Sequence, residues 1–146
     1  MNPDTISGMV LSDAEELLRN LGLDDQYARR LLYWIYRRGI KSFDGINDIP
    51  GRVLNVVSGH VAPGLSSPIA SEVSSDGSVK YLFSNAAGLT HETVWLPDGK
   101  RQTVCVSVQS GCRMGCRFCA TGRNGWGGNL SAGEIVNQVI SIPGQV

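Results

Sequence analysis

Apolar residues recur every three or four positions through roughly the first sixty residues, and this period predicts helices. The first expected helix covers 13–21. Ser12 and Glu15 stand three residues apart, as in a capping box, and Gly22 follows the last turn. Two more helices would complete a bundle that is small for a hydrophobic core standing alone.

The second expected helix runs to Arg38, with Asp24 or Asp25 as its N-terminal cap and Gly39 after its end. Trp34 should pack within the bundle. The apolar stripe facing the core would consist of Tyr27, Leu31, Leu32, Ile35 and Tyr36.

A third helix is expected to begin near Pro50, with Asp48 as its cap. Phe43 and Ile46, in the preceding connection, would fill the space between the helices. The residues of this helix that face the core would be Val53, Leu54 and Val57.

Beyond the helices, the period changes to two, which is typical of strands. Residues 62–68 are rich in Pro, Gly and Ser and form an expected linker. The segments 69–74 and 79–84 predict one β-hairpin, and 89–96 and 102–109 predict a second.

The second hairpin would bring Glu92 close to Cys105. With a two-residue turn at Asp98 and Gly99, Glu92 lies directly opposite Cys105 and shares its face of the sheet. A longer turn would shift this register.

The composition is that of a soluble globular protein, with 42% hydrophobic and 18% charged residues. Thirteen basic residues balance thirteen acidic ones, so net charge favours neither a nucleic acid nor a membrane as partner. No segment reaches the ~18 apolar residues of a membrane span, and residues 1–11 do not resemble a signal peptide. We therefore expect a cytoplasmic protein with reduced cysteines.

The four cysteines all lie between 105 and 119. Cys112, Cys116 and Cys119 follow the spacing C-x3-C-x2-C in a loop broken by glycine, so three thiolates can converge on one metal centre. Structural zinc usually takes four protein ligands, and His91 would be a candidate for the fourth. A [4Fe-4S] cluster on three cysteines instead leaves one iron open to a substrate. The third alternative is that the cysteines lie close together by chance and bind no metal.

The segment after the cysteines contains four glycines between 122 and 128. Ser131 and Glu134 form a capping box that opens a last helix, with Pro143 beyond its end. The inward-facing residues would be Ile135, Val136, Val139 and Ile140. The cysteine loop would thus join a strand to a helix.

Ten of the basic residues fall into two stretches despite the zero net charge. They are Arg29, Arg30, Arg37, Arg38 and Lys41, and then Lys100, Arg101, Arg113, Arg117 and Arg123. Each stretch is either an RNA-binding surface or a solvated face. Trp126 either stacks on a base or covers the cysteine loop. His60 and His91 are expected to be incidental polar residues.

The cysteine spacing, with Phe118 before the last cysteine, resembles the signature of the radical S-adenosylmethionine superfamily. Other segments resemble consecutive blocks of one family within it, the RlmN/Cfr methyltransferases of RNA. These segments are 26–43, Ser75-Asp76-Gly77 with 80–83, Glu92-Thr93-Val94, 104–107, 109–112, and Asn129-Leu130-Ser131 with Glu134-Ile135. The resemblance covers about residues 24–142 in the right order.

The resemblance implies that Cys112, Cys116 and Cys119 hold a [4Fe-4S] cluster whose open iron binds S-adenosylmethionine. An electron from an external flavodoxin-like donor would pass through the cluster and cleave S-adenosylmethionine to a 5′-deoxyadenosyl radical. Glu92 would be the proton acceptor. Cys105 would be the resolving thiol and form a transient disulfide with a methyl-carrying cysteine near the family's C-terminus, which this sequence lacks.

The implied reaction is methylation of carbon 2 of a specific adenine in 23S ribosomal RNA, and in transfer RNA, through a methyl-cysteine intermediate. The carbon-8 branch of the same family is one alternative. A non-catalytic iron–sulfur or RNA-binding module, with a structural cluster, is the other.

The expected fold class is α/β, or α+β for this N-terminal part. A helical RNA-binding accessory domain would cover 1–62, a linker and β-hairpins 63–101, and the start of a radical S-adenosylmethionine (β/α) barrel 102–146. Only 27 residues follow Cys119, whereas a complete eightfold barrel takes ~250 residues. We therefore expect a monomeric N-terminal portion of the enzyme that is inactive alone.

Overall fold

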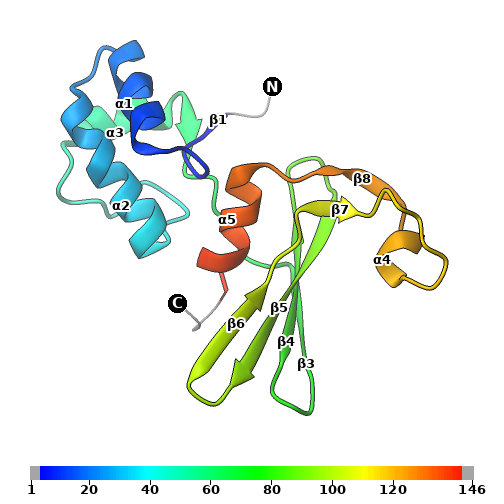
Figure 1. The fold of residues 1–146 in the computed structure, drawn as a ribbon. Coiled ribbons are helices and arrows are strands. Elements are labelled where there is room, and N and C mark those ends of the chain that lie inside the picture. The colour runs from blue at the N-terminus through cyan, green and yellow to red at the C-terminus, as the bar shows by residue number, and fades with distance from the viewer. Residues whose placement is uncertain (1–3, 143–146) are drawn as a thin grey trace. The chain divides into compact units, whose positions relative to one another are not determined.

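The computed structural model describes residues 4–142 (Figure 1). They fold into two compact units. The first comprises 4–65 together with the helix at 132–140, and the second comprises 66–131 with 141–142. The chain therefore leaves the first unit after Leu65, builds the second and returns to the first. The expected mixture of helices and antiparallel hairpins is confirmed.

Helices form most of the first unit. α1 (Leu11–Asn20), α2 (Ala28–Arg38) and α3 (Gly51–Ser58) are the three that the apolar period predicts, and a short 3-10 helix, η1 (Asp25–Tyr27), precedes α2. Side chains that are at most 1% exposed define the centre of their core: Leu18, Leu31, Ile35 and Val57. Within residues 4–142, no helix is both long and apolar enough to cross a membrane.

The cap expected for α1 is wrong. The helix begins at Leu11, so Ser12 already lies in its first turn and cannot act as the cap with Glu15. Instead, a carboxylate oxygen of Asp13 accepts a hydrogen bond from the backbone N–H of Val10 at 3.1 Å. An acidic side chain in the first turn thus satisfies the free N–H at the helix start.

The helical segment made of η1 and α2 begins and ends as predicted, although η1, a 3-10 helix, forms its start. Asp24 caps the helical segment, since its side chain accepts a hydrogen bond from the N–H of Gln26 at 3.0 Å. At the other end, Gly39 adopts a left-handed conformation with φ 62°, and its N–H bonds to the carbonyl of Ile35. Glycine carries no steric penalty in this conformation.

The residue expected to cap α3 has another role. Pro50 occupies the cap position, whereas the Asp48 carboxylate accepts a hydrogen bond from Trp34 Nε1 at 2.6 Å. Asp48 therefore ties the connection before α3 to α2. Ile46 is buried and Phe43 is half-buried against the same core, and Trp34 packs there too, as expected.

The last helix, α5 (Ala132–Ile140), turns a different face inward from the one expected. Its buried residues are Gly133, Asn137 and Gln138, while Val139 is 40% exposed. Gly133 approaches the backbone of Ser7 so closely that a Cβ would lie 2.4 Å from the Ser7 carbonyl oxygen. This backbone contact, which apolar periodicity does not reveal, decides the orientation. Pro143 lies outside the described residues.

A short parallel pair, β1 (Asp4–Thr5) with β2 (Val61–Ala62), joins the two ends of residues 4–65. It continues into backbone hydrogen bonds from Ile6 to Ala62 and from Ser7 to Pro63, both 3.0 Å long. This pairing was not expected from the sequence, because each strand is too short to show a period of two.

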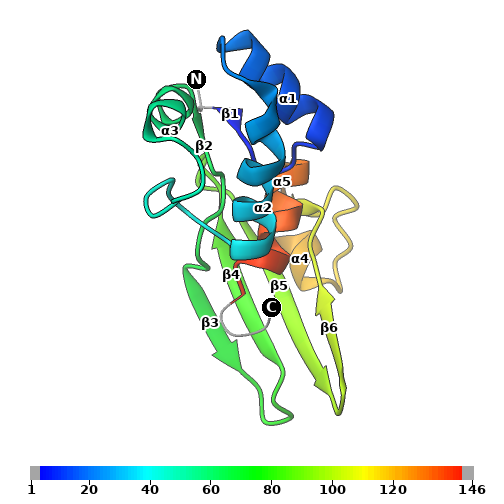
Figure 2. The same ribbon diagram turned by 90° about the vertical axis from the view of Figure 1, so that its left-hand side faces the viewer.

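The second unit is built around a four-stranded antiparallel sheet (Figure 2). Its strands β3 (Ala70–Val73), β4 (Val79–Ser84), β5 (Thr90–Asp98) and β6 (Arg101–Cys105) are neighbours in chain order. Both expected hairpins are confirmed. One face of the sheet carries a small core of Tyr81, Phe83 and Ile142, with Val79, Trp95 and Val104 packed around it.

The register of the second hairpin differs from the one expected. The turn residues are Gly99 and Lys100, because Asp98 pairs with Arg101, and Cys105 therefore lies opposite Val94 instead of Glu92. β6 also ends at Cys105 instead of continuing to residue 109. The shift amounts to two positions along β5, and side chains alternate between faces, so Glu92 and Cys105 still share one face.

The cysteine loop follows β7 (Gln109–Gly111) and leads into a four-residue helix, α4 (Ala120–Arg123). The glycine-rich segment then forms a strand, β8 (Trp126–Asn129), which pairs antiparallel with β7. The sequence did not predict this strand, because glycine is disfavoured in strands and hides the alternating pattern.

Replacing Gly133 with Ala tests the close contact between α5 and Ser7. A Cβ would lie 2.4 Å from a backbone oxygen, so we expect a loss of about 1–3 kcal/mol in the free energy of unfolding of the first unit. Chemical denaturation followed by circular dichroism measures it.

Gly51→Ala is the matched control, since nothing lies within 4 Å of a Cβ there and alanine favours a helix. Equal stability of the Gly133→Ala variant and the wild type would contradict the contact.

Candidate functional site

One row of side chains crosses the exposed face of the sheet. Glu72 on β3 pairs with Lys80 on β4, and Lys80 pairs with Val94 on β5. Val94 in turn pairs with Cys105 on β6. Directly paired residues of an antiparallel sheet point to the same face, so these four side chains stand side by side.

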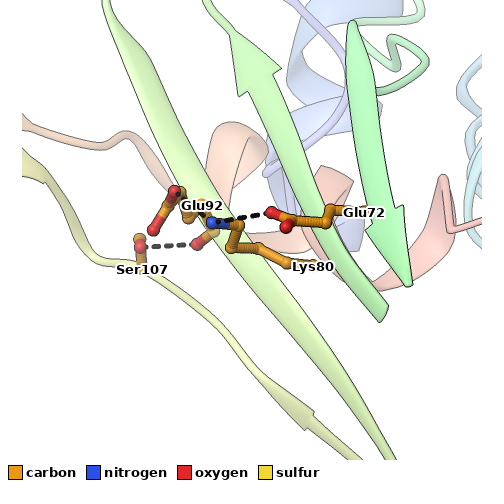
Figure 3. Close-up of polar contacts among 4 residues, drawn as sticks. All are labelled: Glu72, Lys80, Glu92 and Ser107. Carbon is orange, nitrogen blue, oxygen red and sulfur yellow. Dashed lines mark hydrogen bonds and ion pairs between the residues drawn. The ribbon is translucent and has the colours of Figure 1, made fainter. Parts of the chain in front are cut away.

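Glu92 lies in the next row, opposite Leu82 and two residues from Val94 along β5. Its backbone carbonyl accepts a hydrogen bond from Ser107 Oγ at 2.6 Å (Figure 3). Glu92 and Cys105, the residues singled out from the sequence, are thus one row apart on adjacent strands of the same face.

Lys80 stands between two carboxylates (Figure 3). Its Nζ lies 3.3 Å from Glu72 Oε2 and 3.5 Å from Glu92 Oε1. The hydrogen bond to Glu72 and the negative charge of Glu92 raise the pKa of Lys80 above its ordinary value. All three side chains are well exposed, so water screens the attraction and it contributes little to global stability.

Sequence reasoning missed Lys80 and Glu72. The signal was present, because alternation within the first hairpin places opposite charges on the outer face of neighbouring strands, where cross-strand pairs form. It is a weak signal, since such pairs are common on exposed sheets.

Backbone contacts fix the base of the cysteine loop. The N–H of Cys112 bonds to the carbonyl of Gly125 at 3.0 Å, where β7 meets β8. Gly111 has φ 70°, and a Cβ there would lie 1.9 Å from the Gly125 oxygen. Glycine is therefore required at this position both for the conformation and for the space.

Inside the loop, two turns are closed by hydrogen bonds. The N–H of Gly115 bonds to the carbonyl of Cys112 at 3.4 Å, and the N–H of Cys119 to the carbonyl of Cys116 at 3.1 Å. Gly122 packs so tightly on this segment that a Cβ would lie 2.9 Å from the Cys116 nitrogen. The three cysteines are thus carried by consecutive turns.

All four cysteines are free thiols. Cys105 is exposed, and Cys112, Cys116 and Cys119 are half-buried. Hydrogen bonding from the backbone of Gly122 lowers the pKa of the Cys119 thiol, and hydrogen bonds from Thr121 and the positive charge of Arg123 act in the same direction. A lower pKa favours the thiolate, the form that binds metals.

Within residues 4–142, no three His, Cys, Asp or Glu side chains are gathered into a group that could hold a metal ion. The donor chemistry of the loop nevertheless fits an iron–sulfur cluster, since it offers three free thiols on consecutive turns, one with a lowered pKa. Ligation by Cys112, Cys116 and Cys119 stays a prediction.

His91 does not support the zinc alternative. It is 5% exposed, and its ring stacks on that of Phe83 with 5.8 Å between centroids. Phe83 belongs to the core on the buried face of the sheet, whereas Glu92 and Cys105 lie on the other face.

A cavity of about 470 Å³ lies between the sheet and the segment that follows the cysteines. Glu92 and Ser107 line it on one side. Residues 124–127 line it on the other, together with Thr121. Ser110 also lines the cavity and donates a hydrogen bond from its Oγ to the Thr90 carbonyl at 2.7 Å, which ties β7 to β5. Sequence reasoning missed this tie because serine in a short strand carries no distinct signal.

Trp126 is 48% exposed at this cavity. The guanidinium of Arg113 lies 5.4 Å from the centroid of its ring, within range of a cation–π interaction. The structure therefore brings one basic residue of the second stretch onto the aromatic ring of the glycine-rich segment.

The first basic stretch lies on α2 and just after it, and all five of its side chains are exposed. Arg30 donates a hydrogen bond to the Asp48 carbonyl at 2.7 Å, and Arg38 lies 5.7 Å from the Trp34 ring centroid. Arg30 and Arg38 therefore also have contacts within the fold.

Comparison with known proteins finds relatives that are named RNA methyltransferases, although no protein-family model matches the chain. It is 38% identical over 136 residues to the probable dual-specificity RNA methyltransferase RlmN of Phocaeicola vulgatus, covering 93% of this chain and 39% of that protein. It is 43% identical over 133 residues to the corresponding Gloeobacter violaceus protein, covering 88% and 38%. The dual-specificity RNA methyltransferase RlmN of Zymomonas mobilis is 36% identical over 137 residues, covering 91% and 35%.

A solved structure agrees with these relatives. The crystal structure of a radical SAM methyltransferase from Sphaerobacter thermophilus superimposes with a TM-score of 0.85 at 35% identity, covering 95% of this chain and 41% of that one. The chain thus spans about two fifths of the length of the proteins it matches.

The pH dependence of thiol alkylation tests the environment of Cys119. In a variant that retains this thiol alone (Cys105→Ser, Cys112→Ser, Cys116→Ser), we expect the rate with iodoacetamide to rise at a lower pH than for a cysteine peptide of pKa about 8.5. Mass spectrometry of quenched samples gives the rate.

Removing a positive charge raises a thiol pKa, so adding Arg123→Gln should move the midpoint to higher pH. Arg101→Gln, at the start of β6, is the matched control and should leave it in place. A midpoint at or above that of the peptide would contradict the assigned environment.

Proposed function

Because this chain belongs, over the region that it spans, to the family of RlmN-type RNA methyltransferases, we propose that it is part of a radical S-adenosylmethionine enzyme acting on RNA. The substrate would be carbon 2 of a specific adenine in 23S ribosomal RNA and in transfer RNA. The methyl group would pass through a methyl-cysteine of the enzyme.

One juxtaposition carries this proposal. The cavity lined by Glu92 is closed on its other side by the segment that follows the three cysteines. The exposed thiol of Cys105 stands one row away on the same face. The second unit thus brings together a carboxylate, an exposed thiol and the loop that carries the three cysteines. The proposed chemistry requires these groups as base, nucleophile and cluster ligands.

The cluster would be held by Cys112, Cys116 and Cys119, with S-adenosylmethionine on the open iron. The bound cluster would supply the electron, taken from an external donor, for the homolytic cleavage of S-adenosylmethionine. The protein residues around it must hold the adenine and move its ring proton. Trp126 offers an aromatic surface for stacking at the cavity.

The Glu92 carboxylate, which lines the cavity, would take the ring proton from carbon 2 of the RNA–cysteine adduct as this radical adduct gives back the electron that the external donor supplied. Cys105 would then act as a nucleophile. Its thiolate attacks the sulfur of the cysteine linked to the RNA, forms an S–S bond and breaks the S–CH2 bond, whose electron pair takes up a proton to give the methyl group. The exposure of Cys105 suits this role.

The two basic stretches would contact RNA phosphates. Arg29 and Arg37 are exposed on α2, eight positions apart on the same side of the helix. Arg113 and Arg123 lie around the cysteine loop. Each unit thus carries basic side chains that could contact the RNA backbone, despite the neutral net charge.

Anaerobic reconstitution with iron and sulfide tests the cluster. We expect roughly four iron atoms per chain and a [4Fe-4S] electron paramagnetic resonance signal on reduction. We expect both to be lost in each of the variants Cys112→Ala, Cys116→Ala and Cys119→Ala, because the proposed cluster has no further protein ligand that could replace a lost one. Cys105→Ala should retain both. Stoichiometric tetrahedral zinc in anaerobically purified protein would overturn this assignment.

The product of the complete open reading frame tests the reaction. With 23S ribosomal RNA fragments and transfer RNA as substrates, we expect 2-methyladenosine in nuclease digests analysed by mass spectrometry. Glu92→Gln should lower turnover about 100-fold or more, because a neutral amide is no general base. Cys105→Ala should leave the enzyme covalently joined to RNA on a denaturing gel, and Thr103→Ala, on the same face of β6, is its control.

The outcomes separate the alternatives. The appearance of 8-methyladenosine identifies the carbon-8 reaction. A protein that binds RNA and a cluster but yields neither product nor adduct is a non-catalytic module. Normal turnover by Cys105→Ala removes the resolving role from this thiol.

A further inference from the structure

Lys80 has no part in the chemistry proposed above, yet it contacts a residue that does. Its ammonium group lies 3.5 Å from Glu92 Oε1 and 3.3 Å from Glu72 Oε2 (Figure 3). The three residues come from three adjacent strands, β5, β4 and β3. The strand pairing therefore fixes where the stems of these side chains begin.

Glu92 is held at two places, its backbone and its side chain. Ser107 donates a hydrogen bond to its backbone carbonyl at 2.6 Å, and Lys80 reaches its side chain diagonally across the β4–β5 pair. Glu92 lines both the cavity beside the cysteine loop and a smaller groove, of about 330 Å³, in which Lys80 and Glu72 also take part. Lys80 thus contacts Glu92 from the side away from that loop.

Lys80 also separates two like charges. Without its ammonium group, the carboxylates of Glu72 and Glu92 would face each other across β4 with no cation between them and would repel each other. The charged or titratable groups facing Glu92 are Glu72 on β3, Lys80 on β4 and Cys105 on β6; toward the turn, the same face carries Asp98 paired with Arg101. Lys80 is the cation in contact with Glu92.

We propose that Lys80 is a positioning residue, which holds the Glu92 carboxylate directed at the cavity, while Glu72 fixes the ammonium group from the other side. The inference rests on the proposed function, in which Glu92 accepts the ring proton. It adds a residue that decides in which orientation this base works.

The kinetics of RNA methylation by the complete protein, measured as a function of pH, test the proposal. Lys80→Met keeps the apolar stem and removes the charge. It should lower kcat about 10- to 100-fold and leave KM for RNA unchanged. Lys80→Arg should restore most of the rate, because it restores the cation. Glu72→Gln should lower kcat less than Lys80→Met does, because Lys80 keeps its contact with Glu92. Arg52→Met is the matched control: it removes a positive charge from an exposed position on α3 and should leave kcat and KM unchanged.

A second readout is independent of activity. After reductive ¹³C-methylation of lysines, nuclear magnetic resonance follows the titration of Lys80, identified by its loss in Lys80→Met. Each carboxylate raises the pKa of Lys80, so Glu92→Gln and Glu72→Gln should each lower it.

The results separate this inference from the proposed function. A wild-type protein without methylation refutes the proposed function, and the inference with it. If the wild type methylates RNA, an unchanged kcat for Lys80→Met overturns the inference alone. The inference is also overturned if Lys80→Arg fails to restore the rate, or if Glu92→Gln leaves the Lys80 titration unchanged.

Discussion

Strand register governs the geometry of the candidate site, because side chains in an antiparallel sheet alternate between its faces. The turn at Gly99 and Lys100 sets the pairing of β5 with β6 and places Cys105 opposite Val94. A register changed by one residue would turn the Cys105 thiol toward the buried face that carries Phe83. A change by two keeps the face and only moves the thiol along the strand. The position of one two-residue turn thus decides whether Cys105 and Glu92 lie on the same face of the sheet.

The two faces of the sheet divide the work of stability and chemistry. Burial of Tyr81, Phe83 and Ile142 on one face removes apolar area from water, which is the main favourable term in folding. The charged residues of the other face are exposed, and their ion pairs contribute little to stability. Substituting them should therefore change chemistry with little effect on folding. This separation makes the exposed face testable by mutation.

The sequence predicts the elements whose signal is local. Apolar period and a C-terminal glycine predict α2, and alternating residues around short turns predict both hairpins. Two of the errors depend on contacts between residues that are distant in the sequence. Gly133 packs on Ser7 and turns Val139 outward, and Asp48 bonds to Trp34 instead of capping α3. The same limit applies to the site: Glu92 and Cys105 could be placed on one face, whereas the pairing of Lys80 with two carboxylates needed the strand register.

In the cysteine loop, backbone contacts order a candidate site whose proposed ligands lie on adjacent turns. Binding a metal or a cluster includes the cost of ordering its ligands, so the part of the loop already fixed lowers that cost. Hydrogen bonds from Cys112 to Gly125 and from Cys119 to Cys116 fix the loop at its base and near its end. Gly111 and Gly122 permit backbone approaches that a side chain would block. The high glycine content of this segment hides β8 from sequence reasoning. The same glycines allow two short strands and a one-turn helix to hold the three cysteines beside the sheet.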